Sequence, residues 1–533
     1  MAGVSSDRRQ AKRRIVVYDT TLRDGAQGSG VSFSAADKVL IARALDRISV
    51  DYVEGGFPGS NPKDAEFFAT LLQAPLKRSR LAAFGATRRA GGTCEGDANL
   101  TALEQSGAAT WTLVGKSDPW QVKTVLQTTD DENLAMIRES IAFGVAARHE
   151  VVFDAEHFFD GFARDSAYAL EVCAEAGRAG ASWVVLCDTN GGSLPAQIRA
   201  GVEAVAQKLR ETGSKAGVGI HTHNDCELAV ANTLEGVAAG ANMVQGTING
   251  YGERCGNANL ISVVANLVLK LGHDALPPGS VAGFTDLSRT VAEIANLALP
   301  AQQPFVGQAA FAHKGGQHVA AVMKDSYAYQ HIDPGLVGNH QRVLVSELSG
   351  RGNVLSKARE FGLEIDRDDL ETRQLVQHLK ELEHRGYSYE AADASFELLL
   401  RRLRPGYQSP WRLVDFTTSV RKNGASAQAE ATVQIQVGDD LFHTAASGNG
   451  PVNALDAALR KALIPRFPGL KGVRLLDYKV RILDGGAGTA ATTRVLVESG
   501  KGSKRWATVG CSRNIIEASL EALLDSLEFA RLG

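Results

Sequence analysis

Residues 15–25 read Ile-Val-Val-Tyr-Asp-Thr-Thr-Leu-Arg-Asp-Gly, a short apolar, β-branched run that ends in charged and small polar residues. Such a run predicts a buried strand, and the polar cluster after it predicts a loop. An amphipathic helical pattern follows, and the same order of strand, cluster and helix recurs up to about Gly250. The apolar runs lie at residues 15–18, 51–53, 81–84, 110–114, 150–153, 183–187, 218–220 and 243–245.

Eight strand–helix units of this kind predict one closed (β/α)8 TIM barrel. Strands that alternate with helices are typical of a parallel sheet, and a length of about 235 residues fits eight units. The alternative is an open, doubly wound sheet. That fold is usually shorter and carries a G-x-G-x-x-G turn after an early strand, which this sequence lacks.

The ends of the predicted strands carry charged residues and histidines, the side chains best suited to catalysis and metal binding. In a TIM barrel, functional residues are expected at these ends. The first strand ends in Arg23-Asp24 and the seventh in His221-Thr222-His223. Residues i and i+2 of a strand point the same way, so both imidazoles can reach one metal ion. Because strand one pairs with strand eight, next to strand seven, Asp24 can complete the site. The alternatives are polar residues that cap the next helix and a surface Arg–Asp pair.

Two further groups are candidates for acid–base chemistry. Glu156 follows the fifth strand across the barrel mouth from Asp24, where a partly desolvated carboxylate can act as a base or an acid. A salt-bridged loop glutamate is the alternative. His313 and His318 flank a pair of glycines far downstream, where they are either site residues or turn residues.

Composition excludes several classes of function. The 533 residues carry 57 Lys and Arg against 60 Asp and Glu, a net charge of −3, and so lack the basic excess of nucleic-acid or membrane-surface proteins. No apolar run is long enough to predict a membrane span. Six scattered cysteines without a CxxC pair indicate a reducing compartment, and we expect a cytoplasmic protein.

Changes in sequence texture predict four parts. Residues 1–14 are polar and basic and predict a disordered tail. We expect the catalytic barrel in residues 15–285 and helical linker subdomains in residues 286–405. Residues 406–533 predict an α+β domain. In the last part, two predicted strands, each followed by a helix, recur about 62 residues apart and indicate an internal duplication. These strands lie at 432–437 and 494–498, and the helices include 458–463 and 519–527.

Three motifs together resemble the DRE-TIM metallolyase superfamily, and within it the α-isopropylmalate synthase/homocitrate synthase group. The motifs are Asp19–Gln27, His221–Asp225 and Gly252–Ala258. The resemblance extends over about residues 15–530, and the duplicated C-terminal part is similar to the regulatory domain of this group. Stretches 56–64 and 153–161 are most similar to the members that use pyruvate.

The resemblance implies roles for individual residues in the barrel. Asp24, His221 and His223 match the metal ligands of the group, and Asn257 matches a position that supplies a further oxygen ligand. For the catalytic roles, Arg23 matches the arginine that stabilises enolate charge, and Glu156 matches the acidic residue beside the acetyl group. For substrate binding, Arg23 and Thr189 match positions at the keto acid, and the position matched by Thr189 contacts its carboxylate. Asp154, in the substrate pocket, departs from the Tyr or Ser of some relatives.

Two residues outside the barrel also match the group. His318 and Tyr329 correspond to a catalytic pair that a neighbouring subunit lends to the site, with Tyr327 as an alternative to Tyr329. The resemblance therefore implies a homodimer or a higher homo-oligomer.

The implied reaction is a Claisen-type condensation of acetyl-CoA with pyruvate, followed by thioester hydrolysis, to give (R)-citramalate and CoA in isoleucine biosynthesis. It implies a divalent metal ion (Zn, Mn, Mg or Co) as cofactor, acetyl-CoA as co-substrate and isoleucine as an allosteric effector. The general base is Glu156, the His318/Tyr329 pair or a water between them. Alternatives in the same fold are 2-isopropylmalate synthase and homocitrate synthase, and an alternative of another class is a catalytically inactive amino-acid sensor.

Overall fold

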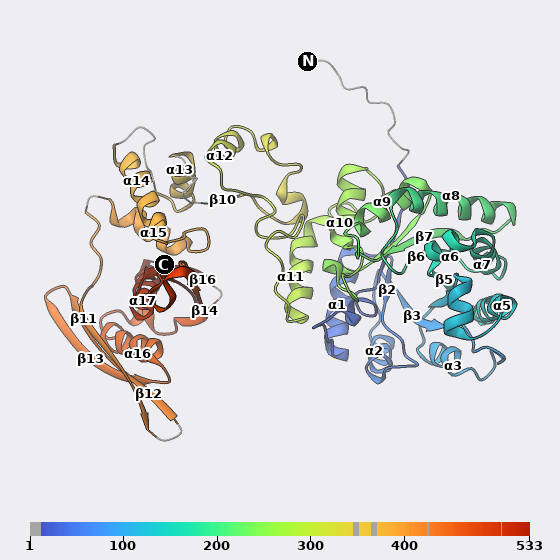
Figure 1. Cartoon of the computed structure of the whole chain (residues 1–533), viewed down its shortest axis with the longest axis horizontal. Coiled ribbons are helices and arrows are strands. Elements are labelled where there is room, and N and C mark those ends of the chain that lie inside the picture. The colour runs from blue at the N-terminus through green and yellow to red at the C-terminus, as the bar shows by residue number, and fades with distance from the viewer. Residues whose placement is uncertain are drawn as a thin grey trace, which may run out of the picture. The chain divides into compact units, whose positions relative to one another are not determined.

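A computed structural model describes residues 12–344, 351–363, 370–404, 406–423, 426–502 and 504–532. Most of the predicted N-terminal tail, up to residue 11, lies outside the described residues, as does Pro405 at the predicted boundary before the last domain. The chain forms two compact units (Figure 1). The first comprises Met1–Phe311 with Ile332–His340, and the second comprises Ala312–His331 with Gln341–Gly533.

The first unit contains a closed barrel of eight parallel strands in sequence order, which confirms the predicted TIM barrel. Strand β8 pairs with β1 and closes it, with Tyr18 opposite Gln245. Several strands run further than predicted, so that Asp154 and Glu156 lie within the fifth strand and not after it. The strands are β1 (Val16–Asp19), β2 (Tyr52–Glu54), β3 (Arg80–Ala86), β4 (Thr110–Lys116), β5 (Glu150–Glu156), β6 (Trp183–Asp188), β7 (Gly217–Thr222) and β8 (Met243–Gly246).

Helices surround these strands (Figure 1) and begin where the sequence offers caps. Ser34 and Asp37 form a reciprocal capping box at the start of α1, and Asn61 caps α2, which has Pro62 in its first turn. The helices of this unit are α1 (Ala35–Ile48), α2 (Pro62–Gln73), α3 (Ala98–Gln105), α4 (Pro119–Gln121), α5 (Asp130–Ala146), α6 (Phe158–Arg164), α7 (Ser166–Arg178), α8 (Pro195–Glu211), α9 (Ala229–Ala239), α10 (Leu260–Ala265) and α11 (Phe284–Ile294).

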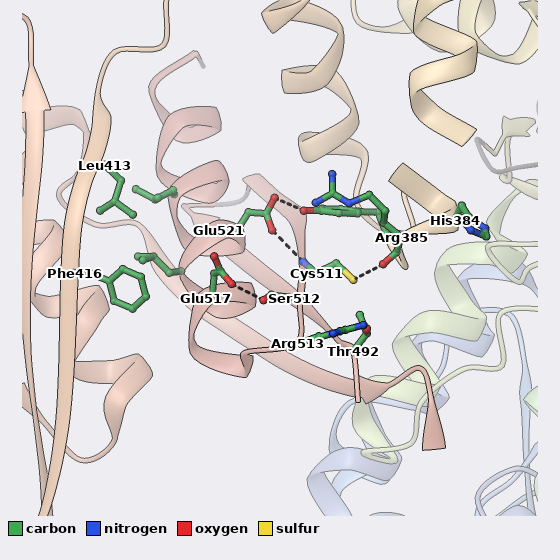
Figure 2. Close-up of a pocket in the computed structure, with 13 residues that line it drawn as sticks. His384, Arg385, Leu413, Phe416, Thr492, Cys511, Ser512, Arg513, Glu517 and Glu521 are labelled. Atoms are coloured by element: carbon green, nitrogen blue, oxygen red, sulfur yellow. Dashed lines mark hydrogen bonds between the residues drawn. The ribbon is translucent and has the colours of Figure 1, made fainter. Parts of the chain in front are cut away.

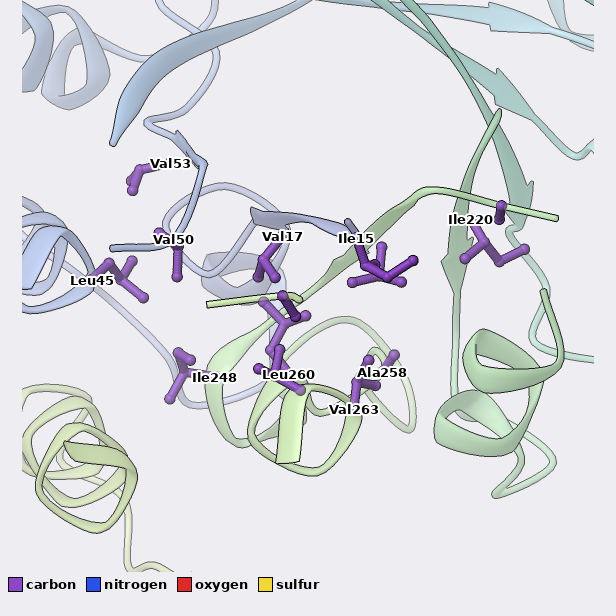
Figure 3. Close-up of a cluster of buried hydrophobic side chains, with 14 of the residues drawn as sticks. Ile15, Val17, Leu45, Val50, Val53, Ile220, Ile248, Ala258, Leu260 and Val263 are labelled. Atoms are coloured by element: carbon purple, nitrogen blue, oxygen red, sulfur yellow. The ribbon is translucent and has the colours of Figure 1, made fainter. Parts of the chain in front are cut away.

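The core of this unit has two layers, because successive residues of a strand face opposite sides. Outward-facing residues such as Val17 and Ile220 pack with helix residues such as Leu45, Leu260 and Val263 (Figure 3). Each fully buried side chain of this size contributes about 1.5–3 kcal/mol. Inward-facing residues form a second cluster inside the barrel: Tyr18, Tyr52, Ala82, Val152, Val185 and Met243.

The second unit begins with short elements and helices and ends in two copies of a three-stranded antiparallel sheet followed by a helix. This order confirms the predicted duplication. The first part contains β9 (Ala312–His313), α12 (Gly316–Val322), β10 (Arg342–Val343), α13 (Arg351–Glu360), α14 (Leu370–His384) and α15 (Asp393–Arg402). The copies are β11 (Arg412–Asn423), β12 (Ser426–Val437), β13 (Asp440–Gly448) and α16 (Pro451–Leu463), then β14 (Arg474–Ile482), β15 (Thr493–Lys501), β16 (Lys504–Ser512) and α17 (Ile515–Leu532).

The two copies share one apolar core, which contains Val433 and Leu459 from the first and Val497 and Leu523 from the second. A further cluster joins Phe396 and other residues of the preceding helices to Val509 and Cys511 of β16. The helical segment therefore packs directly on the duplicated part. Among the described residues, no helix is long and apolar enough to cross a membrane.

Candidate active site

Three predicted residues, Asp24, His221 and His223, come together at the carboxyl end of the barrel. Each offers a ligand atom, and these atoms lie within 4.8 Å of one another. The Nε2 atom of His221 lies 3.2 Å from Asp24 Oδ2 and 3.3 Å from His223 Nε2. All three side chains are buried.

A tight turn after β1 puts Asp24 in this place. The carboxylate of Asp19 accepts hydrogen bonds from the backbone N and the Oγ1 of Thr21, at 3.0 and 2.8 Å. The same Oγ1 accepts a hydrogen bond from the backbone N of Ile248, at 2.8 Å, which ties the turn to the segment after β8. The backbone N of Asp24 then donates to Thr20 O over 2.9 Å.

The cluster is electrostatically coupled. Burial raises the pKa of Asp24, but the charge of Arg23 and the contacts with both histidines outweigh this effect and leave its pKa well below the usual range. Burial lowers the pKa of His221, but Asp24 outweighs burial and leaves it raised. Burial, with the charge of His221, lowers the pKa of His223 to about 4. The cluster thus combines a carboxylate with an imidazole that stays neutral at pH 7.

These residues fit a divalent metal ion. Two imidazoles and one carboxylate are common ligands of transition metals and leave coordination positions open for a substrate. Asn257 lies opposite His223 in an isolated antiparallel bridge. Among the described residues, neither Asn257 Oδ1 nor His223 Nδ1 has a hydrogen-bond partner, although both are buried. A buried oxygen without a partner is costly, and a cation would satisfy it.

Arg23 lies beside the cluster in a fixed orientation. Its Nε donates to Glu54 Oε2 over 2.6 Å, and its guanidinium carbon lies 4.0 Å from the centre of the Phe84 ring. Glu54 is fully buried and also accepts a hydrogen bond from the Tyr18 hydroxyl, at 2.9 Å. Burial lowers the pKa of Arg23, but Glu54 and Asp24 outweigh this and raise it. The guanidinium is therefore a fixed, always-charged donor.

A cavity of about 340 Å³ opens above these groups and contains the other predicted barrel residues. Its lining includes Glu156, which forms an ion pair with Lys116, and Thr189, whose hydroxyl accepts a hydrogen bond from the backbone N of His157 at 2.8 Å. Asp154 also lines it, and burial, with the charge of Glu54, raises its pKa to about 7. The complete lining is Arg23, Asp24, Gln27, Phe57, Phe84, Val114, Asp154, Glu156, Cys187, Thr189, His221, His223, Glu253 and Arg254.

The predicted pair outside the barrel belongs to the second unit. His318 and Tyr329 stack on each other with ring centres 4.2 Å apart, and Tyr329 is half exposed. Tyr327, the alternative, is 74% exposed. The stacking brings His318 and Tyr329 together within the second unit.

A separate cavity of about 930 Å³ lies within the second unit (Figure 2). One wall is apolar, with Leu413 and Phe416 of β11, and the other carries Arg385, Glu517 and Glu521. Glu521 is held by the Tyr387 hydroxyl, at 2.6 Å, and by the backbone N of Cys511. None of the residues predicted to be catalytic lies in this cavity.

Comparison with known proteins identifies the family. The chain is 49% identical to the (R)-citramalate synthase of Synechocystis sp. over 528 residues, which cover 97% of this chain and 96% of that protein. It is 48% identical to the (R)-citramalate synthase of Aquifex aeolicus, with 97% of both chains covered. The chain belongs to the citramalate synthase family. A 2-isopropylmalate synthase of Cronobacter sakazakii is 29% identical over 97% of this chain and 94% of its own length.

Family models match consecutive parts of this citramalate synthase family member. The HMGL-like family matches residues 14–291, the homocitrate synthase post-HMGL domain-like family residues 305–387, and the LeuA allosteric (dimerisation) domain residues 390–530. The last match covers the duplicated sheets.

Several residues to which the sequence assigned no role support the site in this family member. Glu54, Lys116 and Gln245 contact predicted site residues, yet none stands in a motif that the sequence alone connects with them. Glu54 ends the second strand, which is the expected position for a functional group in a barrel, and that position is the only signal.

Proposed function

We propose that this chain condenses acetyl-CoA with pyruvate and hydrolyses the thioester, to give (R)-citramalate and CoA. The observation that carries this proposal is the buried cluster of Asp24, His221 and His223 beside the fixed guanidinium of Arg23. Similarity to (R)-citramalate synthases over nearly the whole chain supports pyruvate as the acceptor.

Asp24, His221 and His223 would hold a divalent metal ion, with Asn257 as a further oxygen ligand. When bound there, such an ion would supply Lewis-acid polarisation of the carbonyl group of a keto acid. Zn, Mn, Mg and Co are the candidates, since imidazole and carboxylate ligands suit these ions to different degrees.

Arg23 stabilises the negative charge that develops on oxygen during the reaction. Because Glu54 holds its Nε, the two terminal nitrogens remain available to donate. A donor fixed before the reaction does not reorganise as the charge develops, and such donors supply much of the rate enhancement in other enzymes.

Thr189 binds the carboxylate of pyruvate. Its oxygen already accepts a hydrogen bond from the backbone N of His157, so the hydroxyl proton is free to donate to a substrate oxygen. Together with Arg23 this contact orients the keto acid in the cavity.

A base removes a proton from the acetyl methyl group, and the resulting carbon attacks the carbonyl carbon of pyruvate. One C–C bond forms, and the former carbonyl oxygen takes up a proton. Water then cleaves the C–S bond and releases CoA. Glu156, positioned by Lys116, is one candidate base, and the His318/Tyr329 pair of a neighbouring subunit is the other, directly or through a water.

We also propose that the protein is a homodimer whose C-terminal part, residues 390–530, provides the contact and binds an inhibitory amino acid. The match to the LeuA allosteric (dimerisation) domain supports both functions. Isoleucine is the expected effector and leucine the second candidate, since citramalate formation is an early step towards isoleucine. We also propose that the enzyme acts in the cytoplasm.

A thiol-release assay tests the proposed reaction. Metal-loaded enzyme with acetyl-CoA and pyruvate should release CoA and form (R)-citramalate, and prior removal of metal with a chelator should abolish both. CoA release without citramalate would show simple thioester hydrolysis and would overturn the proposal.

A further inference from the structure

Gln245 lies inside the barrel, between the two strands that carry the metal-ligand cluster. It is fully buried in β8, with His221 of β7 as its register partner on one side and Tyr18 of β1 on the other. No motif or comparison assigns it a role. A buried amide needs partners for both its oxygen and its nitrogen.

Both ends of the amide have such partners. Gln245 Oε1 lies 2.9 Å from His221 Nδ1, and Gln245 Nε2 donates to Asp154 Oδ1 over 3.0 Å. These contacts form a hydrogen-bond chain across the barrel interior. It runs from Asp154 on β5, through Gln245 and His221, to Asp24 after β1.

The hydrogen-bond chain has a fixed direction when Asp154 is ionised, because a carboxylate oxygen accepts hydrogen bonds. Asp154 therefore attracts the NH2 group of Gln245 and repels its oxygen. With the amide in that orientation, Gln245 Oε1 faces His221 Nδ1, which must then carry a proton. The reversed amide would place two acceptors in contact at Asp154 and would require an unprotonated Nδ1.

We infer that Gln245 is a positioning residue that keeps a proton on His221 Nδ1 and so directs His221 Nε2 to the metal, and that Asp154 sets the orientation of the Gln245 amide. The inference rests on the proposed metal role of the cluster. A histidine that ligates a metal through one nitrogen commonly donates from the other to an oxygen, which fixes the ring and raises its basicity.

A role in orienting Gln245 explains why a carboxylate is buried at position 154. As a residue of the cavity lining alone, Asp154 is a buried carboxylate whose hydrogen bond comes from the neutral amide of Gln245, and burial of such a group is costly. As the acceptor at the end of the hydrogen-bond chain, Asp154 selects one orientation of the Gln245 amide. That orientation in turn selects one tautomer of His221.

The test measures metal affinity of the full-length protein by competition between Co²⁺ and a chelator, with the d–d spectrum of bound Co²⁺ as a second readout. Gln245→Met keeps the side-chain volume and removes both hydrogen bonds. Loss of an outer-shell partner of this kind typically weakens metal binding by about 10- to 100-fold, and we expect a loss in that range. Met243→Leu is the matched control, since it changes a buried apolar side chain of the same strand, two residues before Gln245, and should leave affinity within about twofold.

The double variant Asp154→Asn/Gln245→Glu separates positioning from general destabilisation. It exchanges the carboxylate and the amide, so that an acceptor still faces His221 Nδ1 and a donor amide still faces that acceptor. Affinity should return to within about threefold of wild type, with a wild-type spectrum. A purely structural role for Gln245 predicts no such recovery.

The outcomes separate this inference from the proposed function. Wild-type affinity in Gln245→Met, or a double variant as weak as Gln245→Met, would overturn the inference while metal binding by the wild type stands. If Gln245→Met does not fold, the double variant alone decides. The proposed metal role fails if the wild type does not bind Co²⁺, or if His223→Ala binds Co²⁺ as tightly as the wild type. The inference then fails with it.

Discussion

Arg23 and Glu54 form a buried ion pair at the base of the cavity, with Arg23 Nε 2.6 Å from Glu54 Oε2. Glu54 has no exposed surface, and the guanidinium also lies against the Phe84 ring. A long, flexible side chain is thereby held in one orientation beside the metal-ligand cluster. We therefore expect Glu54 to affect the reaction through the orientation of Arg23.

Glu54→Gln should therefore impair catalysis although Glu54 does not line the cavity. The amide keeps an acceptor for Arg23 Nε but loses the charge, and hydrogen bonds to charged groups contribute about 1.5–3 kcal/mol. We expect kcat to fall about 10- to 100-fold with little change in metal content. The measurement is steady-state CoA release with metal analysis of the same sample. Unchanged kcat would show that Arg23 keeps its position without the ion pair.

Arg23→Lys should be more severe, with a loss of at least about 100-fold in kcat. A lysine presents one ammonium group, which cannot both hold Glu54 and donate to the substrate in the geometry of a planar guanidinium. Metal binding should persist, because Asp24, His221 and His223 remain. A loss of only a few fold would restrict Arg23 to a structural role.

Asp19 predicts a specific dependence of stability on pH. Burial raises its pKa to about 7 in the folded chain, compared with about 4 when unfolded. The folded state then holds more protons between these values, so this group lowers the free energy of unfolding as pH rises from 4 to 7. Asp19→Asn removes the titration. The stability of the variant relative to wild type should therefore increase by about 2–3 kcal/mol from pH 5 to pH 8.

Thermal or denaturant unfolding at the two pH values measures this difference. Asp19→Asn keeps an acceptor for the backbone N of Thr21 but loses the one for its Oγ1. The lost hydrogen bond shifts stability by a similar amount at both pH values, so the change of the difference with pH reports the titration. A constant difference between variant and wild type across this range would contradict a raised pKa for Asp19.

A complementation experiment tests whether one subunit completes the site of another. His318→Ala and His221→Ala should each be inactive as homodimers. Mixing them under conditions of demonstrated subunit exchange should restore part of the activity, because a hybrid dimer contains one intact combination of barrel and His318. No recovery after proven exchange would place His318 in the site of its own subunit or outside catalysis.

Sequence patterns predicted the barrel well because each buried strand is a short apolar, β-branched run with a polar end. They located Asp24, His221 and His223 because barrel closure brings strands one, seven and eight together. They placed Asp154 and Glu156 after the fifth strand, which instead continues to Glu156. The buried Asp154 accepts a hydrogen bond from Gln245 of β8, and no local sequence pattern reports that contact.

The same reason explains why no role was predicted for Glu54, Lys116 and Gln245. Each contacts a partner on another strand or in the turn after one, and the contact depends on three-dimensional register and side-chain reach. Sequence spacing predicts which strands are neighbours but not which side chains meet across the interior.

The most direct test of the account is the preference for the acceptor keto acid. Metal-loaded, full-length enzyme is assayed for CoA release from acetyl-CoA with pyruvate, 2-oxoisovalerate and 2-oxoglutarate in turn, and kcat/KM is compared. We expect the highest value for pyruvate, in keeping with the similarity to (R)-citramalate synthases. A higher kcat/KM for 2-oxoisovalerate or 2-oxoglutarate would contradict it and would assign the chain the reaction of an isopropylmalate or homocitrate synthase.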